Sequence, residues 1–238
     1  MSDDDKYIEM DICDSIMERP IVFSINDESF FIYHACLGKI YLLHRIISSL
    51  NINQEVISKN PYLEAMRLCK INPKEVCRII SYFTFKNKDD IFDTRKVDKR
   101  TDMFLKNLSI DEMSTLLVTI LTLDNTDLFI KHLGIDKDLD ERKRISSVKK
   151  YSGYFSFGGK SPYGTLIDFA CHRYGWSMDY VIWGISYTNL RMLMVDTISS
   201  VHLSKEEMRQ LGMKDNIEII DAGDPKNRKF IEMLLNED

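Results

Sequence analysis

The sequence predicts a mainly α protein, a multi-helix bundle with one small β-hairpin near its N-terminus and a smaller helical subdomain at its C-terminus. Three observations support this fold class. The 238 residues include only 10 Gly and 5 Pro, which are few for a turn-rich β fold. Apolar residues recur at helical spacing through most of the chain from Leu37 onward. One stretch, residues 20–34, instead places two β-branched and aromatic runs around a polar turn.

The N-terminal elements are predicted from turn residues, helix caps and prolines. Residues 26–28, Asn-Asp-Glu, form the polar turn of the hairpin, and the capping box over 109–112 starts a later helix. Prolines at the first helical position open two further helices. The expected helix starts are Leu37, Pro61, Pro73, Asp93, Ser109 and Asn125. Residues 116–123 are apolar on nearly every side, which predicts that their helix is the central buried one.

The C-terminal elements are predicted after a change in composition. Residues 136–150 are highly charged and fit either a helix or a linker. Residues 151–163 are rich in Gly, Ser and aromatic side chains, and they break any periodicity. The remaining expected elements are a helix over 164–174, a short helix from Met178 to Trp183, a helix from Tyr187 to Val201, a helix after the capping box at Ser204, a short strand over 217–220 and a last helix after Pro225.

Charge and composition divide the chain into four expected parts. Residues 1–18 hold seven acidic residues and one basic residue, a net charge of −6, so the net charge of −5 for the whole chain leaves +1 for the remainder. Self-repulsion and little surface to bury predict that this start is a flexible tail. The expected parts are an acidic tail over 1–19, a β-hairpin and helical domain over 20–150, a Gly and aromatic linker over 151–163 and a C-terminal helical subdomain over 164–238.

The sequence predicts neither an enzyme nor a metal or cofactor site. The five Cys and five His lack the paired spacing of zinc ligands, and no Ser-His-Asp or Cys-His arrangement has a recognisable frame. No apolar run approaches the ~20 residues that span a bilayer, and the N-terminus is acidic, unlike a basic signal peptide. We therefore expect a cytoplasmic protein with no catalytic residues, no cofactor, no metal and no membrane contact.

A nucleotide-dependent enzyme is a rival with weak support. Gly159-Lys160-Ser161 resembles the end of a phosphate-binding loop. That loop has four residues between its two glycines, whereas five separate Gly153 from Gly159 here. Pro162 then follows, where a helix would already be donating N–H groups to the phosphate. A glycine-rich turn is the better interpretation.

A nucleic-acid-binding regulator is the alternative from another class. It would use the helix-turn-helix-like segment 164–184 and a basic run within 142–150. The run consists of Arg142, Lys143, Arg144, Lys149 and Lys150. Acidic residues lie just upstream, as on a solvated helix face, and residues 178–183 offer no Arg, Lys, Asn or Gln to base edges. Nucleic acid is therefore not an expected partner.

An aromatic cluster is the most distinctive feature of the chain. Within fourteen residues it holds both Trp and three Tyr, namely Tyr174, Trp176, Tyr180, Trp183 and Tyr187. One interpretation is that these rings fix the crossing of helices in a small domain. The other is that part of the cluster, with Met192 and Met194, forms an apolar surface for another chain, because Trp, Tyr and Met are enriched in such surfaces.

The segment 171–181, Cys-His-Arg-Tyr-Gly-Trp-Ser-Met-Asp-Tyr-Val, resembles tail assembly chaperones of long-tailed bacteriophages. In that family an aromatic residue near a helix end is followed by a short helix and then by a Leu-rich one, which here starts near Asn189. The resemblance is firmest over residues 164–203. The residues that carry the motif are Tyr174, Gly175, Trp176, Asp179 and Tyr180.

The resemblance implies a helical, non-enzymatic protein that acts in the host cell cytoplasm during virion morphogenesis. Its partners would be the long, aggregation-prone tape-measure protein and the tail tube protein, with no small-molecule substrate, and a homo-oligomer is left open. The expected partner-binding residues are Tyr174, Trp176, Asp179, Tyr180, Trp183, Met192 and Met194.

Overall fold

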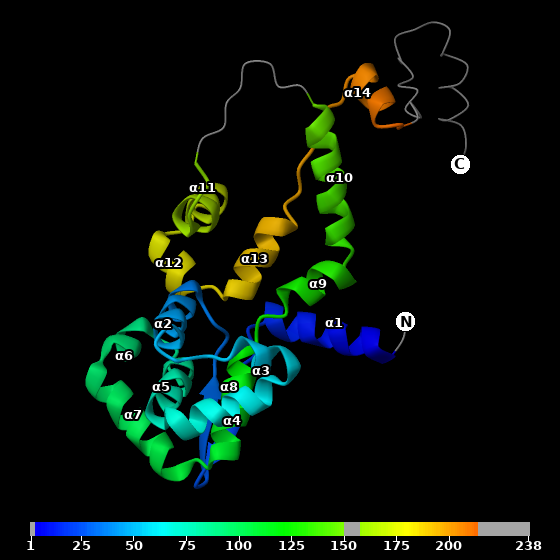
Figure 1. The fold of residues 1–238 in the computed structure, drawn as a ribbon. Coiled ribbons are helices and arrows are strands. Elements are labelled where there is room, and N and C mark those ends of the chain that lie inside the picture. The colour runs from blue at the N-terminus through cyan, green and yellow to red at the C-terminus, as the bar shows by residue number, and fades with distance from the viewer. Residues whose placement is uncertain (1–2, 150–157, 214–238) are drawn as a thin grey trace, which may run out of the picture. The chain divides into compact units, whose positions relative to one another are not determined.

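The computed structural model describes residues 3–149 and 158–213, which form fourteen α-helices, one π-helical turn and one antiparallel hairpin (Figure 1). This confirms the mainly α fold with a small N-terminal hairpin. The six helix starts expected up to Asn125 agree with the structure to within one residue. The strand expected over 217–220 and the helix after Pro225 lie outside the described residues. The elements are α1 (Asp3–Ile16), β1 (Ile21–Ile25), β2 (Glu28–Ile32), α2 (Leu37–Ile47), α3 (Gln54–Lys59), α4 (Pro61–Ile71), α5 (Pro73–Thr84), α6 (Lys88–Phe92), α7 (Thr94–Asn107), α8 (Ile110–Leu121), α9 (Thr126–His132), α10 (Ile135–Val148), η1 (Tyr163–Ile167), α11 (Asp168–Tyr174), α12 (Met178–Trp183), α13 (Tyr187–Val195) and α14 (Lys205–Gln210).

The chain divides into two compact units, and the division differs from the predicted one. The main unit comprises residues 1–137 and 156–197, and the small unit comprises residues 138–155 and 198–238. Residues 164–197, expected in a separate C-terminal subdomain, belong to the main unit. The reason is packing, because α12 lies on α2 while α13 lies on α9 and α1. The helices after the linker thus bury their apolar faces against N-terminal helices.

The hairpin forms as predicted within residues 20–34, with Ile25 opposite Glu28 beside the turn. The turn itself has two residues, Asn26 and Asp27, and both have positive φ (49° and 64°). Asn and Asp tolerate this left-handed conformation, and two-residue turns of this kind match the twist of the paired strands. β2 packs on α5, so the hairpin is part of the core of the main unit.

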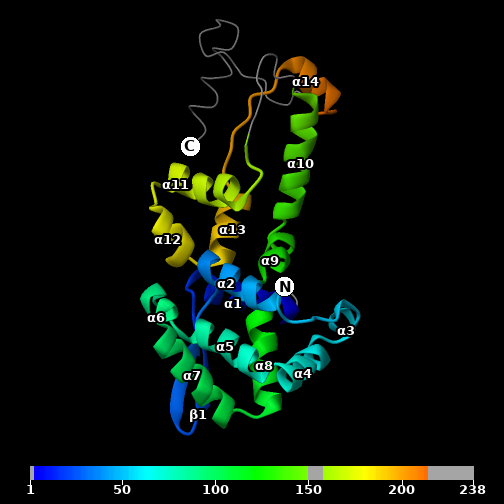
Figure 2. The same cartoon turned by 60° about the vertical axis from the view of Figure 1, so that its left-hand side comes forward.

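The centre of the main unit is α5. It packs on α2, α4, α7, α8 and β2, and Val76, Ile79 and Ile80 on it are fully buried. Figure 2 shows α5 among α4, α7 and α8. The prediction that residues 116–123 form the central buried helix is wrong, because α8 buries one face and leaves Leu121 exposed. Apolar composition permits burial on several sides, but the number of neighbouring elements decides how much of a helix is buried.

The N-terminal segment, predicted to be a flexible tail, forms helix α1. Ile8, Ile12 and Ser15 make up its less exposed face, and α1 packs on α9 and α13. Glu9 Oε1 lies 2.8 Å from Nε2 of His132 on α9. Acidic residues at the start of a helix interact favourably with the positive end of its dipole, which offsets their mutual repulsion.

Residues 136–150, for which the sequence allowed a helix or a linker, are helical over most of their length as α10. Two ion pairs join residues one turn apart, Asp140 with Lys143 (2.9 Å) and Glu141 with Arg144 (3.2 Å). In the small unit, Arg144 also donates to the carbonyl of Leu211, and Lys149 donates to the carbonyl of His202. These bonds hold α10 beside the segments that flank α14.

Candidate functional site

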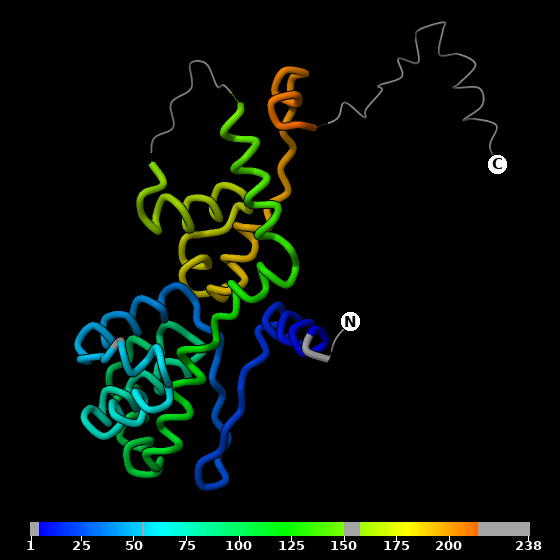
Figure 3. The backbone as a smooth tube through the Cα atoms, turned by 45° about the vertical axis from the view of Figure 1, so that its right-hand side comes forward, coloured from blue at the N-terminus to red at the C-terminus, as the bar shows by residue number. Residues whose placement is uncertain are grey.

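The segment that carries the expected partner-binding residues forms three short helices joined by tight turns. α11 ends at Gly175, whose φ of 66° allows the chain to turn sharply. The Ser177 hydroxyl caps α12 by accepting from the Tyr180 N–H (3.2 Å), and the Ser186 hydroxyl caps α13 by accepting from the Asn189 N–H (3.2 Å). Figure 3 shows α11, α12 and α13 as one close group.

The centre of this group is filled by small and aliphatic side chains. Ala170, Val181 and Leu190, one from each helix, are fully buried, and Leu37 of α2 joins them. The larger rings pack around this centre and are themselves only partly buried. The apolar interior of the group therefore needs no Trp or Tyr at its middle.

Four rings form a continuous line along α11 and α12, which we call the aromatic row: Phe169, Tyr174, Trp176 and Tyr180. Successive ring centroids lie 6.1, 4.7 and 5.2 Å apart, with the Tyr174 and Trp176 rings stacked and the other two contacts edge to face. The Tyr174 hydroxyl donates to the Leu193 carbonyl of α13 (3.3 Å). Tyr180 is 44% exposed, and the other three rings are half-buried. The row is thus anchored on one side and open to solvent on the other.

The structure separates Trp183 from the aromatic row. Its ring lies against Gly38 of α2, where an added Cβ would be 2.5 Å from the ring. It also meets Phe92 of α6 edge to face, with centroids 5.3 Å apart. Trp183 packs in a different apolar cluster, with Phe85, Ile91 and Val97. Its position joins α12 to α2 and α6, which is the structural interpretation that the sequence offered for the whole cluster.

Asp179 is exposed and is paired with Lys88 of α6. Its carboxylate accepts a hydrogen bond from the ammonium, which raises the pKa of Lys88. Exposed ion pairs of this kind contribute little to stability. Asp179 thus has a partner within the main unit, Lys88, and it precedes Tyr180 of the aromatic row.

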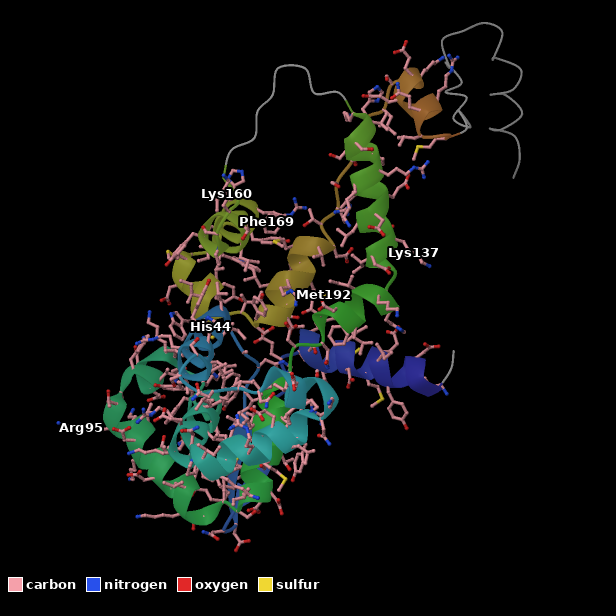
Figure 4. The ribbon with its side chains drawn as sticks, viewed as in Figure 1. His44, Arg95, Lys137, Lys160, Phe169 and Met192 are labelled. Carbon is pink, nitrogen blue, oxygen red and sulfur yellow. The ribbon has the colours of Figure 1, made fainter. Side chains whose placement is uncertain are left out.

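Met192 and Met194 are both half-buried on α13. Residues two apart on a helix point about 200° away from each other, so these two side chains cannot share one face. Figure 4 labels Met192 on α13 and Phe169 on α11. Arg191 holds α13 to α9 through ion pairs with Asp124 (3.0 Å) and Asp127 (2.9 Å).

Two sets of exposed apolar side chains were missed in the sequence. Met178, 48% exposed, stands two residues before Tyr180 in the first turn of α12. Tyr7, Met10 and Met17 are exposed on α1 and just after it. Tyr7 and Met10 are three residues apart and Met10 and Met17 are seven apart, which is the spacing of one helix face. The sequence contains this periodicity, but the many acidic residues around it favoured the prediction of a flexible tail.

The structure gives little support to the two other candidate sites, the phosphate-binding turn at residues 159–161 and the nucleic-acid-binding segments. Ser161 lies two residues before the π-helical turn, its carbonyl accepting from the Thr165 N–H (2.9 Å), while Lys160 is exposed at the approach to η1 (Figure 4). In the basic run, Lys143, Arg144 and Lys149 bind carboxylates or carbonyls of the small unit. The outer face of α12 presents no cation to a base edge.

Neither a metal-binding cluster nor a single membrane-spanning helix lies in the described residues. There, no group of three or more His, Cys, Asp or Glu side chains is placed to hold a metal ion. Over the same residues no single helix is long and apolar enough to cross a membrane, although α8 and α9, bent by 50°, meet that criterion as a pair. All five Cys are free thiols.

Comparison with known proteins identifies no relative for this chain. No family model, no curated protein and no solved structure matches the sequence or the fold.

Proposed function

We propose that this chain is a non-enzymatic, protein-binding factor of phage tail morphogenesis, a tail assembly chaperone that holds the tape-measure protein in the host cytoplasm. The observation that carries the proposal is the half-exposed aromatic row along α11 and α12. The resemblance of residues 171–181 to tail assembly chaperones supports the same role.

The chemistry of the row suits an apolar protein partner. Trp and Tyr offer a large contact area for few rotatable bonds, and their polar atoms tolerate water when the partner leaves. Leu193 is exposed and extends the apolar surface beside Tyr174, whereas Met178 is exposed on another face of α12. Met adapts to irregular partners, as a chaperone for a long helical client requires.

The row is also held in place before any partner arrives. Tyr174 stacks on Trp176 and donates to the α13 backbone, and Trp176 meets Tyr180 edge to face. Pre-ordered side chains lose less entropy on binding. In this role the row covers an apolar face of the client until tail tube subunits replace it.

The test is co-expression with the longest helical protein encoded beside this gene. We expect the chain to keep that client soluble, and Trp176→Ala and Tyr180→Ala to abolish the effect. Tyr41→Ala is the matched control, because Tyr41 on α2 has the same 44% exposure as Tyr180 but lies outside the row. A client equally soluble with Tyr180→Ala and Trp176→Ala would overturn the proposal.

The alternative, a nucleic-acid-binding regulator, makes a different prediction. It requires binding that weakens steeply with salt, because phosphate contacts release counterions. A fluorescence assay with DNA and RNA at low salt distinguishes the two roles. Site-specific binding lost in Lys143→Ala with Arg144→Ala would favour the regulator over the chaperone.

A further inference from the structure

A cleft of about 530 Å³ opens in the main unit beside the start of α2. Its walls come from the turn after α1, the end of β2, the connection between α5 and α6 and the connection between α12 and α13. Its lining residues include the aromatic Tyr33 and Trp183 and the basic Lys39 and Lys86. The volume is within the ~300–1,000 Å³ typical of small-molecule sites. We call it the Lys39 cleft.

Lys39 is 2% exposed, and the titratable group that interacts with its ammonium is the Cys36 thiol, whose pKa burial raises above 9.0, so that the thiol is neutral at neutral pH and is no counter-ion. No carboxylate of the described residues pairs with its Nζ, and no oxygen of those residues accepts a hydrogen bond from it. The polar contacts of Nζ are instead two ring faces, with the centroid of Tyr33 at 5.4 Å and that of Phe83 at 5.6 Å. No side-chain nitrogen or oxygen of the described residues is both fully buried and without a hydrogen-bond partner. Because Nζ has no such partner, it is not fully buried, and the cleft that Lys39 lines is the space that gives access to it.

The charge of Lys39 is uncompensated. Burial lowers its pKa to about 8, so roughly nine-tenths of the side chain is still protonated at neutral pH. Lys39 also stands in the first turn of α2, where the positive end of the helix dipole disfavours a cation. That turn has no acidic residue, and the N-cap residue Cys36 makes no capping hydrogen bond with its side chain. The Lys39 ammonium therefore lacks a negatively charged neighbour.

The other charged groups of the cleft are consistent with an anion. Lys86 and His34 line it, and Glu18 is the acidic residue among its walls. The Glu18 Oε1 atom is already engaged, accepting from the Ser186 N–H (2.7 Å) and from the side-chain amide of Asn189 (3.3 Å). Glu18 thus caps the start of α13 and keeps its negative charge, but it forms no ion pair with Lys39.

We propose that the Lys39 cleft binds a small molecule bearing an oxyanion, phosphate or carboxylate, with the oxyanion against the Lys39 ammonium. Lys86 supplies a second cation, and the rings of Tyr33 and Trp183 face the body of the ligand. Burial desolvates most of the lysine, so a charged hydrogen bond formed there is strengthened by the apolar surroundings. This site is independent of the aromatic row and of the protein-binding role.

Thermal unfolding of the full chain tests the proposal at neutral pH in phosphate, acetate or chloride of equal ionic strength. We expect phosphate or acetate to raise the Tm by about 2–4 °C over chloride. The better of the two identifies the oxyanion. Lys39→Met should remove this rise, while Lys70→Met, at an exposed lysine of α4, should keep it. An equal rise in all three proteins would mark a general salt effect and overturn the proposal.

Fluorescence gives a second readout that does not depend on stability. In Trp176→Phe the remaining Trp183 reports on the cleft that it lines. Titration with inorganic phosphate should change its emission in a saturable way, and adding Lys39→Met should abolish the change. An absent or linear response in Trp176→Phe would overturn the proposal even if Lys39→Met altered the fold.

Discussion

The core around α5 and the α11–α13 group use aromatic residues in opposite ways. In the core the rings that meet are Phe23, Phe30 and Phe104, with centroids 5.2–5.9 Å apart, and Phe104 is fully buried. In the α11–α13 group the fully buried residues are small or aliphatic, and the Tyr and Trp rings lie at the rim. Phe has no polar atom to satisfy, whereas Tyr and Trp fit positions with one dry and one wet side. Aromatic density in a sequence is therefore a poor guide to burial.

The largest expected effect is at Phe104, where the comparison predicts a residue essential to stability. Phe104→Ala removes a ring that contacts both Phe23 and Phe30 and leaves a cavity. We expect the free energy of unfolding to fall by about 3–5 kcal/mol, measured by urea denaturation. A loss below about 1 kcal/mol would mean that this region is no better packed than the aromatic row.

Gly38→Ala tests the contact that separates Trp183 from the row. The new Cβ would lie 2.5 Å from the Trp183 ring, so the ring must move. We expect a loss of about 1–3 kcal/mol in the free energy of unfolding from overpacking. In a Trp183→Leu background the same substitution should cost much less, and a double-mutant cycle measures this coupling. Equal costs in both backgrounds would contradict the assigned position of Trp183.

The two regions also differ in whether they bury a charged side chain. The region around α5 does, because the carboxylate of Glu64 on α4 is only 1% exposed. Hydrogen bonds from Arg67 (2.8 and 2.6 Å), and one from the Asn53 N–H, hold the pKa of Glu64 below its ordinary value of 4.5. The stabilisation of the folded state by this carboxylate is fully present above pH 4.5 and is lost as the pH falls through the lowered pKa of Glu64.

Glu64→Gln should therefore lower the free energy of unfolding by about 1–2 kcal/mol at neutral pH and flatten its decline in acid. Denaturant titrations at a series of pH values measure both effects. Glu55→Gln, at an exposed carboxylate of α3, is the control and should leave the acid limb unchanged. A decline in Glu64→Gln as steep as in the unmodified chain would assign acid sensitivity to other carboxylates.

The smallest effect is expected at Tyr180, on the open side of the row. Tyr180→Ala should change the free energy of unfolding by less than about 1 kcal/mol, followed by circular dichroism on heating. The change in client solubility should be much larger than this change in stability. A loss comparable to that of Phe104→Ala would mean that the row is part of the core.

Local signals were sufficient for most helix boundaries. The capping boxes predicted at Ser109 and Ser204 both appear in the structure as reciprocal hydrogen bonds. A cap involves residues only three or four positions apart, so the sequence contains everything needed to predict it. The hairpin turn at residues 26–28 was predictable for the same reason.

The tertiary structure decided everything that depends on distant partners. α1 is a helix that packs on α9 and α13, short helices α3 and α6 lacked a readable period, and α13 ends at Val195 and not Val201. The same is true of the candidate site, where two expected residues have distant partners. Trp183 packs on Gly38, and Asp179 pairs with Lys88, 91 residues away along the chain.

The sequence by itself determined the helical class, the hairpin, most helix starts and the aromatic cluster as a feature to explain. Which rings face water, and that Lys39 is buried without a counter-ion, was decided only by tertiary packing. The physical reason is range, because helical periodicity and capping act over one or two turns. Burial depends on which distant surfaces come together, and on whether each polar atom finds a partner there.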